Sequence, residues 1–518
     1  MSENALADLT YEDFPYPGMT FRETHPDSIA AVASFYRLNT QTPENCRVLE
    51  LGCGNGSNLL WMASGLPESE FIGIDLSRKH IEEANESAAA LNLRNAEFYQ
   101  KDILGIDGRE LGKFDYIIAH GLFSWVPDSV CEKVFQLYGE LLAPKGVGYV
   151  SFNVLPGYYL RQIMREAMQF HLKDDPPAAE GVKRARNFAE FLSETTHEDP
   201  LYNYLLKSEF RGMIDRDDSV IFHDDLSVFN NAFLFSDFIS RAEDHGLQFL
   251  SESERLTSLP YGIPADVLQF IDENSKNLNE REQYIDLFSG TNFRRTLLCR
   301  DDIEPIRDFD PEVIKTLFVS TPLRPDSADP ASEDRFPKKF TADPGFTIEI
   351  DHILTRAFLT RFASNEFHEI PFKELIDGAI DELNEKGVAF DDRENEIRTT
   401  VSTLTELFSK HLIRFHVSRS AAINYLPEKP KVSDYVRMRA QKGNRVATVH
   451  GLNLELSDDF TRELFILLTG ERTRDELIAG LVSKLYNDDE GGIGEFSGKT
   501  AQMLDSSLDW MVRVGFII

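Results

Sequence analysis

The sequence predicts an α/β fold, with a doubly wound, mainly parallel sheet in its first part and smaller helix-rich units after it. Two observations lead to this prediction. Between residues 47 and 153, short runs rich in β-branched and aromatic residues alternate with helical patterns, as in successive βαβ units. After residue 300, amphipathic helical patterns predominate. Because the chain has 518 residues, we expect about three or four domains.

The core is expected to have seven strands. The hydrophobic runs that predict the first five are Arg47–Leu51, Glu70–Asp75, Ala96–Lys101, Phe114–Ala119 and Gly146–Asn153. Helical patterns cover Thr24–Leu38, Ser57–Gly65 and Arg78–Leu91. Residues 160–225 are mostly helical and charged, which indicates an insertion. A helix over Ser236–Gly246 and strands over Leu247–Leu250 and Phe293–Cys299 then complete a Rossmann-like domain over residues 1–300.

The second half is predicted to contain a linker and two small modules. Residues 301–344 form the expected linker, because five prolines lie between Ser320 and Pro344 and favour an extended or mobile chain. Residues 345–426 show three amphipathic helices and a strand, Ile353–Phe362, Phe372–Leu383, Glu394–Leu412 and Ile413–Val417. Residues 432–518 show three more, Asp458–Leu468, Thr473–Leu485 and Lys499–Val514, before a terminal strand, Gly515–Ile518. Both modules are therefore expected to be winged-helix-like.

The charge of the chain limits its partners. The formal net charge is −33 at pH 7, and so acidic a surface repels phosphate backbones. We therefore expect no nucleic-acid partner, and a cationic protein segment that carries lysine would be attracted. The alternative is that the acidity only keeps the protein soluble. The acidic C-terminal modules are expected to contact protein, with a homodimer as one possibility.

The cysteines and the N-terminus favour a cytoplasmic location. Cys46, Cys53, Cys131 and Cys299 occur singly, which is typical of a reducing compartment and not of a zinc site. The first residues lack the basic and apolar regions of a signal peptide. No apolar run approaches the roughly 18–20 residues that cross a bilayer. We expect neither a membrane segment nor a bound metal.

A glycine-rich turn follows the first predicted strand. Gly52, Gly54 and Gly56 have the spacing G-x-G-x-G, whereas dinucleotide-binding proteins use G-x-G-x-x-G to hold a pyrophosphate. Glu50 stands immediately before the glycines, where a carboxylate would repel a pyrophosphate. It suits instead a ligand with an amino group and a sulfonium. The pattern indicates S-adenosylmethionine, with a nicotinamide cofactor as the disfavoured alternative.

Two further carboxylates follow the next two strands. Asp75 comes about 20 residues after the glycines, where an acidic side chain can accept both ribose hydroxyls. Asp102 ends the third strand, where it can accept from the adenine amino group. Three acidic residues at the carboxyl ends of three successive strands, together with the glycine turn, predict a cofactor site at that edge of the sheet.

With these residues the chain resembles the class I methyltransferases. Within them it is similar to a bacterial family that joins a methyltransferase domain to a methyltransferase regulatory region and includes protein-lysine methyltransferases. The segments that carry the resemblance are Thr24–Asp27, Tyr116–Pro127, Tyr149–Gly157, His223–Leu226 and Phe293–Arg300. It covers residues 10–300, with the regulatory region at about 220–300, and is looser over 345–518.

The resemblance and the positions in the chain together give the expected site residues. The expected cofactor contacts are His25, Glu50, Gly52, Cys53, Gly54, Gly56, Asn58, Asp75, Leu76, Asp102, Ile103 and His120. The expected residues around the transferred methyl group are His120, Ser124, Trp125, Asn153 and Tyr158. Trp125 could equally be a packing residue, and Tyr158 and Tyr159 could simply belong to the next helix.

The expected reaction is methyl transfer from S-adenosylmethionine by in-line displacement, for which an enzyme mainly aligns the reacting atoms in a dry pocket. The resemblance implies a protein lysine as acceptor. Residues 120–123 (His-Gly-Leu-Phe) lack the acidic or asparagine-Pro-Pro-aromatic motif of enzymes that methylate adenine or glutamine nitrogen. Two alternatives stay open: a small-molecule methyltransferase, and a cofactor-binding regulatory protein without turnover.

Overall fold

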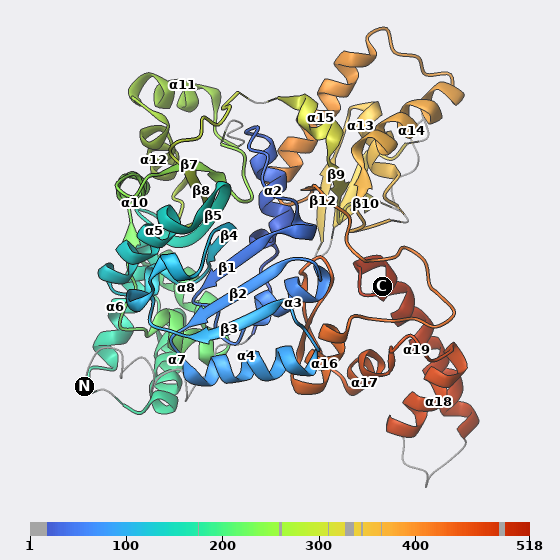
Figure 1. The fold of residues 1–518 in the computed structure, drawn as a ribbon, viewed down its shortest axis with the longest axis horizontal. Coiled ribbons are helices and arrows are strands. Elements are labelled where there is room, and N and C mark those ends of the chain that lie inside the picture. The colour runs from blue at the N-terminus through green and yellow to red at the C-terminus, as the bar shows by residue number, and fades with distance from the viewer. Residues whose placement is uncertain are drawn as a thin grey trace.

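The computed structural model describes residues 18–174, 176–257, 262–308, 310–326, 336–342, 345–363, 365–485 and 493–518. Its centre is a mixed sheet with the strand order β3-β2-β1-β4-β5-β8-β7 (Figure 1). The bounds are β1 Arg47–Leu51, β2 Glu70–Asp75, β3 Ala96–Gln100, β4 Phe114–Ala119, β5 Leu142–Val154, β7 Leu247–Glu252 and β8 Phe293–Arg300. The first five are parallel, and β8 runs antiparallel to β5 and β7. The predicted seven-stranded Rossmann-like core is confirmed.

Both faces of the sheet are covered, because its strands alternate their hydrophobic side chains between them. Val48 of β1 packs with α2 (Pro26–Ser34), α3 (Ser57–Gly65) and α4 (Arg78–Ala90). Its neighbour Leu49 packs on the opposite face with α5 (Asp128–Leu141) and α10 (Phe235–Glu243).

The predicted helical insertion forms a small unit of its own between β5 and β7. It consists of α6 Tyr159–His171, α7 Ala178–Glu194, α8 Pro200–Ile214, α9 Asp218–Val220 and a π-helical turn, η6 Ile221–Asp225. Met164, Met168, Val182 and Phe210 belong to a separate hydrophobic cluster among these helices. The two-residue strand β6 (Ala232–Phe233) then returns the chain to the end of β5. Helices α11 (Ala265–Asn274) and α12 (Leu278–Ser289) follow β7.

The middle unit begins earlier than expected. Its three helices are α13 Ile353–Thr360, α14 Phe372–Glu385 and α15 Arg393–Ser409. Its small sheets are β13-β9-β14 (Ile370–Pro371, Phe318–Ser320, Arg414–His416) and β10-β11-β12 (Arg324–Pro325, Lys339–Ala342, Phe346–Glu349). The linker predicted at 301–344 is therefore wrong for the parts that form β9, β10 and β11. Those parts carry buried residues such as Val319 and Phe340, which the prolines obscured in the sequence.

The C-terminal unit contains α16 Asp434–Lys442, β15 Arg445–Ala447, β16 Asn453–Glu455, α17 Asp459–Leu467, α18 Arg474–Leu485 and α19 Ile493–Val514. Helices α17 and α18 agree with the predicted ones to within one residue at each end, and α19 ends at Val514 as predicted but begins before the predicted Lys499. In place of the predicted terminal strand, Ile517 makes a single β-bridge to Val432. Helix α16 and the β15–β16 hairpin were not predicted, because they are short and lack a clear hydrophobic period.

Both C-terminal units pack against the face of the sheet that carries α2 and α3 (Figure 1). His416 of β14 forms an ion pair with Asp27 of α2, with 2.7 Å between Nδ1 and Oδ2. The indole N–H of Trp61 in α3 donates to the carbonyl of Thr448, at 3.0 Å. The second half of the chain thus shares one continuous hydrophobic core with the first.

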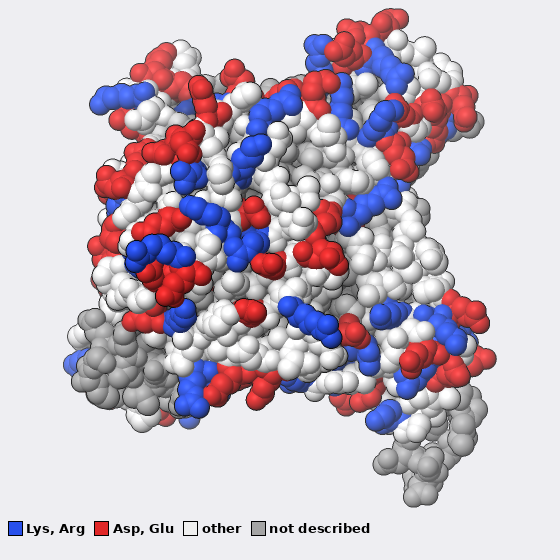
Figure 2. Space-filling view, in the orientation of Figure 1, with Lys and Arg blue, Asp and Glu red and all other residues white. Residues whose placement is uncertain are grey.

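Within the described residues, no helix is both long and apolar enough to cross a bilayer. On the face drawn in Figure 2, lysine and arginine side chains are interspersed with acidic ones and do not gather into one basic surface.

Candidate functional site

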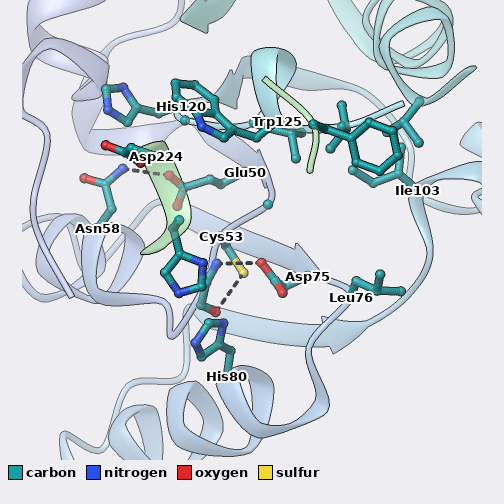
Figure 3. A pocket seen from close by; sticks show the side chains of 18 of the residues that line it. Glu50, Cys53, Asn58, Asp75, Leu76, His80, Ile103, His120, Trp125 and Asp224 are labelled. Atoms are coloured by element: carbon teal, nitrogen blue, oxygen red, sulfur yellow. Dashed lines mark hydrogen bonds between the residues drawn. The ribbon is translucent and has the colours of Figure 1, made fainter. Parts of the chain in front are cut away.

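A cavity of about 540 Å³ opens at the carboxyl ends of the central strands. This edge is where ligands bind in open α/β sheets, because loops from several neighbouring strands converge there. The loops after β1, β2, β3 and β4 form one side of the cavity, and the helical insertion closes the other. Figure 3 shows Glu50, Asp75, His120, Trp125 and Asp224 around it.

The glycine turn needs glycine for two reasons. Gly52, Gly54 and Gly56 have φ values of +75°, +53° and +72°, a region that other residues rarely adopt. A Cβ on Gly56 would lie 2.6 Å from the ring of Phe98, so the backbone passes close to β3. Gly52 and Gly54 line the cavity with Cys53, while Gly56 packs behind it.

Glu50 is buried with one carboxylate oxygen unsatisfied. Its Oε1 accepts a hydrogen bond from Asn58 at 2.9 Å, and Oε2 has no partner among the described residues. Burial raises the pKa of Glu50 to about 8. A buried carboxylate that lacks a partner is costly, and an ammonium group in the cavity would relieve that cost. This orphaned oxygen fits the amino group of S-adenosylmethionine.

Asp75 organises the turn that it faces. Its carboxylate accepts from the backbone N–H of Gly54 and of Ser77, both at 2.8 Å. Burial raises its pKa, and these backbone bonds act in the opposite sense. Asp102 caps a short helix, η3 Ile103–Gly105, by accepting from the N–H of Leu104 at 3.0 Å.

Leu76 and Ile103 line the cavity beside these carboxylates. Two aliphatic side chains next to two acceptors suit a flat adenine ring and a ribose. The residues predicted for the cofactor from the ends of β1, β2 and β3 are therefore brought together around one cavity.

His120 lies at the end of β4 and also lines the cavity. Its Nδ1 is hydrogen-bonded to the hydroxyl of Tyr149 at 2.9 Å, and its ring stacks on Phe21 with 3.7 Å between centroids. Burial lowers the pKa of His120 to about 3, so its imidazole is neutral at physiological pH.

Besides Gly56, two predicted site residues lie outside the cavity lining, His25 and Ser124. His25 caps α2 by accepting from the N–H of Asp27 at 3.2 Å, and its ring lies beside Trp61. Ser124 is fully buried and accepts from the N–H of Asn153 at 2.8 Å. Neither is among the described residues that line the cavity, although Ser124 holds the backbone of Asn153, which does.

Asn153 and Tyr158 line the acceptor side, as predicted. The hydroxyl of Tyr158 donates to Oδ1 of Asn230 at 2.7 Å, and the amide of Asn153 reaches the same oxygen at 3.4 Å. Trp125 also lines the cavity, and its indole N–H has no acceptor among the described residues. Tyr159 instead points outward and is 55% exposed.

The sequence did not single out the residues that the insertion and its neighbours contribute. These are Arg161, His223, Asp224, Phe229, Asn292 and Phe293. Burial, together with the charge of Asp225, raises the pKa of Asp224 to about 6. The resemblance carried by His223–Leu226 and Phe293–Arg300 was the available signal, and it did not indicate which side chains face the cavity. Phe21 and His80 were missed as well.

Comparison with known protein families identifies three regions. Residues 43–195 match the family described as "Methyltransferase domain". Residues 217–300 match "Predicted methyltransferase regulatory domain", and residues 428–491 match "PKMT, C-terminal winged helix domain". The three matches follow one another along the chain without overlap.

Similar proteins include two from Rickettsia prowazekii. RP789 is 31% identical over 385 residues, which are 72% of this chain and 68% of that protein. RP028 is 30% identical over 243 residues, which are 47% of this chain and 97% of that protein. The solved structure of PKMT2 from Rickettsia typhi in complex with AdoHcy superposes with a TM-score of 0.85 at 24% identity. That superposition covers 97% of this chain and 100% of the other, and it supports the fold.

The sheet order, the glycine turn and the orphaned carboxylate of Glu50 agree with these matches. The chain is therefore an S-adenosylmethionine-dependent methyltransferase, and it belongs to the class I family that combines a methyltransferase domain, a regulatory domain and a PKMT-type winged helix domain.

Proposed function

We propose that this enzyme transfers methyl groups to lysine side chains of a protein. The observation that carries the proposal is the composition of the acceptor side of the cavity, where one carboxylate, Asp224, stands among the aromatic side chains of Trp125, Tyr158, Phe229 and Phe293. Aromatic rings and a carboxylate together favour a long aliphatic chain that ends in an ammonium group. The winged helix domain of the PKMT type and the similarity to PKMT2 support the same acceptor.

The proposed cofactor contacts follow from the residues on the cofactor side of the cavity, at the ends of β1, β2 and β3. Glu50 holds the amino group of the cofactor through its unpaired oxygen, and Asp75 accepts from the ribose hydroxyls. Asp102 accepts from the adenine amino group, with Leu76 and Ile103 packed on the ring. These residues all line the cavity. Bound in this way, the cofactor supplies a methyl group on a sulfonium, an electrophile that needs alignment more than activation.

Asp224 attracts the lysine ammonium into the cavity. Because its pKa is about 6, its carboxyl is mostly ionised at pH 7. The lysine nitrogen must lose a proton before it attacks, and the apolar walls favour its neutral form. With the cofactor bound, the neutral nitrogen would attack the methyl carbon while the electrons of the carbon–sulfur bond stay on sulfur, which would leave S-adenosylhomocysteine, and the proton lost beforehand would pass to solvent. Tyr158, fixed by Asn230 at 2.7 Å, keeps the acceptor in line.

The other expectations complete the proposal. We place the reaction in the cytoplasm, on a protein and not on a nucleic acid. We assign residues 1–300 to the catalytic domain and residues 432–518 to the winged-helix-like module. A homodimer through the C-terminal units stays a prediction, which light scattering of the purified protein tests.

Labelled S-adenosylmethionine tests the acceptor. The enzyme is incubated with an extract of cells that lack its gene, and the protein fraction is hydrolysed and analysed for methylated lysine. The proposal is supported if the native enzyme puts label into methyl-lysine, the Asp224→Asn variant does not, and the exposed control Tyr159→Phe still does. Label in the small-molecule fraction would show a metabolite acceptor, and the absence of label from both fractions would indicate a regulatory protein.

A further inference from the structure

The first described residues of the chain form part of the cofactor cavity and are held by the last domain. Gly18, Met19 and Phe21 line the cavity, and Gly18 lies close to Asn55 in the glycine turn and to Ser57 after it. Phe21 stacks on His120, and its backbone N–H donates to Oδ1 of Asn58 at 2.9 Å. Asn58 in turn donates to Glu50. We call Gly18–Phe21 the N-terminal strap.

Arg439 of α16 holds one end of the strap. Its guanidinium donates to the carbonyl of Gly18 at 2.8 Å and to the hydroxyl of Ser57 at 3.3 Å. It forms no ion pair with any described residue, so its hydrogen bonds are to neutral groups. A Cβ on Gly18 would clash with the Ser57 hydroxyl and lie 3.0 Å from the Arg439 guanidinium, so the strap passes tightly between the two.

The side-chain amide of Asn453 in β16 both accepts hydrogen bonds from Thr20, in the middle of the strap, and donates one to it. Its Oδ1 accepts from the backbone N–H and from the hydroxyl of Thr20, both at 3.1 Å. Its amide N–H donates to the carbonyl of Thr20 at 2.7 Å. Such a two-way amide clamp fixes a backbone segment as a neighbouring strand would.

The same unit also contacts Ser57, the residue that follows the glycine turn. Tyr435 of α16 donates its hydroxyl to the carbonyl of Ser57 at 3.1 Å, at the first turn of α3. Ser57 lines the cavity beside Asn55 and Asn58. Figure 1 shows α16 alongside α3. The C-terminal unit therefore contacts two segments of the cofactor site, the strap and the start of α3.

We propose that the winged helix unit is an obligatory part of the cofactor site, with Arg439 and Asn453 as positioning residues that hold the N-terminal strap over the bound cofactor. The strap links Arg439 and Asn453 to His120 and Asn58, which line the cavity. Because coupling between two sites is reciprocal, cofactor binding also fastens the C-terminal unit to the core.

Calorimetric titration of the full-length protein with S-adenosylhomocysteine tests the proposal. We expect Arg439→Gln and Asn453→Ala each to weaken binding about tenfold or more. Asn453 makes three hydrogen bonds to the strap, and Arg439 makes one to the strap and one to Ser57 beside it. The matched control is Lys442→Met. Lys442 also lies on α16 and also contacts the core, through Ser87 of α4 at 3.2 Å, but it does not touch the strap. We expect the control to bind within about twofold of the native protein.

Hydrogen exchange separates positioning from a merely structural role. In the native protein, S-adenosylhomocysteine should slow exchange of the Thr20 and Phe21 amides and of the β15–β16 hairpin, which lies outside the cavity. This measurement decides the question even if both variants fail to fold. Two results would overturn the proposal. One is that the folded Arg439→Gln and Asn453→Ala variants bind S-adenosylhomocysteine with native affinity. The other is that the ligand leaves hydrogen exchange in the β15–β16 hairpin unchanged.

Discussion

Replacing Glu50 with glutamine should remove most of the pH dependence of cofactor binding. Without ligand, burial raises the pKa of Glu50 to about 8, so its carboxyl is largely protonated at pH 6. The ammonium group of the ligand binds only to the ionised form of Glu50. Ionising the carboxyl two pH units below its pKa costs about 2.7 kcal/mol. The ionised fraction of Glu50 rises from about 1% at pH 6 to about 50% at pH 8, so native affinity for S-adenosylhomocysteine should rise roughly 50-fold over that range.

The assay is calorimetric titration at several pH values in buffers of different ionisation enthalpy. At pH 6 the native protein should release about one proton for each ligand bound. Glu50→Gln should bind weakly at every pH, and its deficit should be largest at pH 8. The control is Glu70→Gln, an exposed carboxylate that pairs with Arg47 at the opposite end of the sheet. Native binding that neither releases a proton nor strengthens with pH would refute the assignment of Glu50.

The same substitution has an expected effect on stability. The pKa of the Glu50 carboxyl is near 4.5 in the unfolded chain and about 8 in the folded protein. Because the folded state binds this proton more tightly, the free energy of unfolding falls as pH rises from about 4.5 to about 8. Unliganded Glu50→Gln should therefore melt above the native protein at pH 8, although it binds cofactor less well. A lower melting temperature would show that the Glu50 carboxylate stabilises the unliganded fold.

Three further predictions concern other parts of the molecule. Asp75→Ala should weaken S-adenosylhomocysteine binding at least about tenfold by calorimetry, since it removes a ribose acceptor and the partner of the Gly54 N–H; unchanged affinity would contradict the proposed contact. The ring protons of His120 should show no titration by NMR between pH 5 and 8, because its pKa is about 3. Arg294→Met should lower the free energy of unfolding in urea by about 3–5 kcal/mol, because it leaves the buried carboxylates of Glu252 and Asp286 without their cation and Glu282 with Arg255 alone. A loss below about 1 kcal/mol would mean that the carboxylates find protons or other partners.

The core and the cofactor side of the site were predictable because their signals are local. Short hydrophobic runs predicted β1, β2 and β4 with their observed bounds. The G-x-G-x-G spacing identified three positions with positive φ. Since parallel strands end at one edge of a sheet, the residues after them had to meet, and Glu50, Asp75 and Asp102 do.

The local sequence pattern could not predict which of two adjacent side chains points into the cavity. Ser124 and Trp125 are adjacent in the sequence, yet the first is buried against the backbone of Asn153 and the second faces the cavity. Likewise Tyr158 lines the cavity and Tyr159 faces solvent. Neighbouring residues at the end of a strand or the start of a helix diverge, and packing alone selects the one that faces the ligand.

The amino-acid sequence by itself determined the class of enzyme, its cofactor and the strands that carry the site, because each rests on residues close together in the chain. Only the tertiary structure decided what surrounds that site. Asp224 reaches the cavity from the helical insertion, and Arg439 contacts Gly18 across 421 positions of sequence. Contacts of such separation depend on how whole units dock, and no local hydrophobic or glycine pattern encodes that docking.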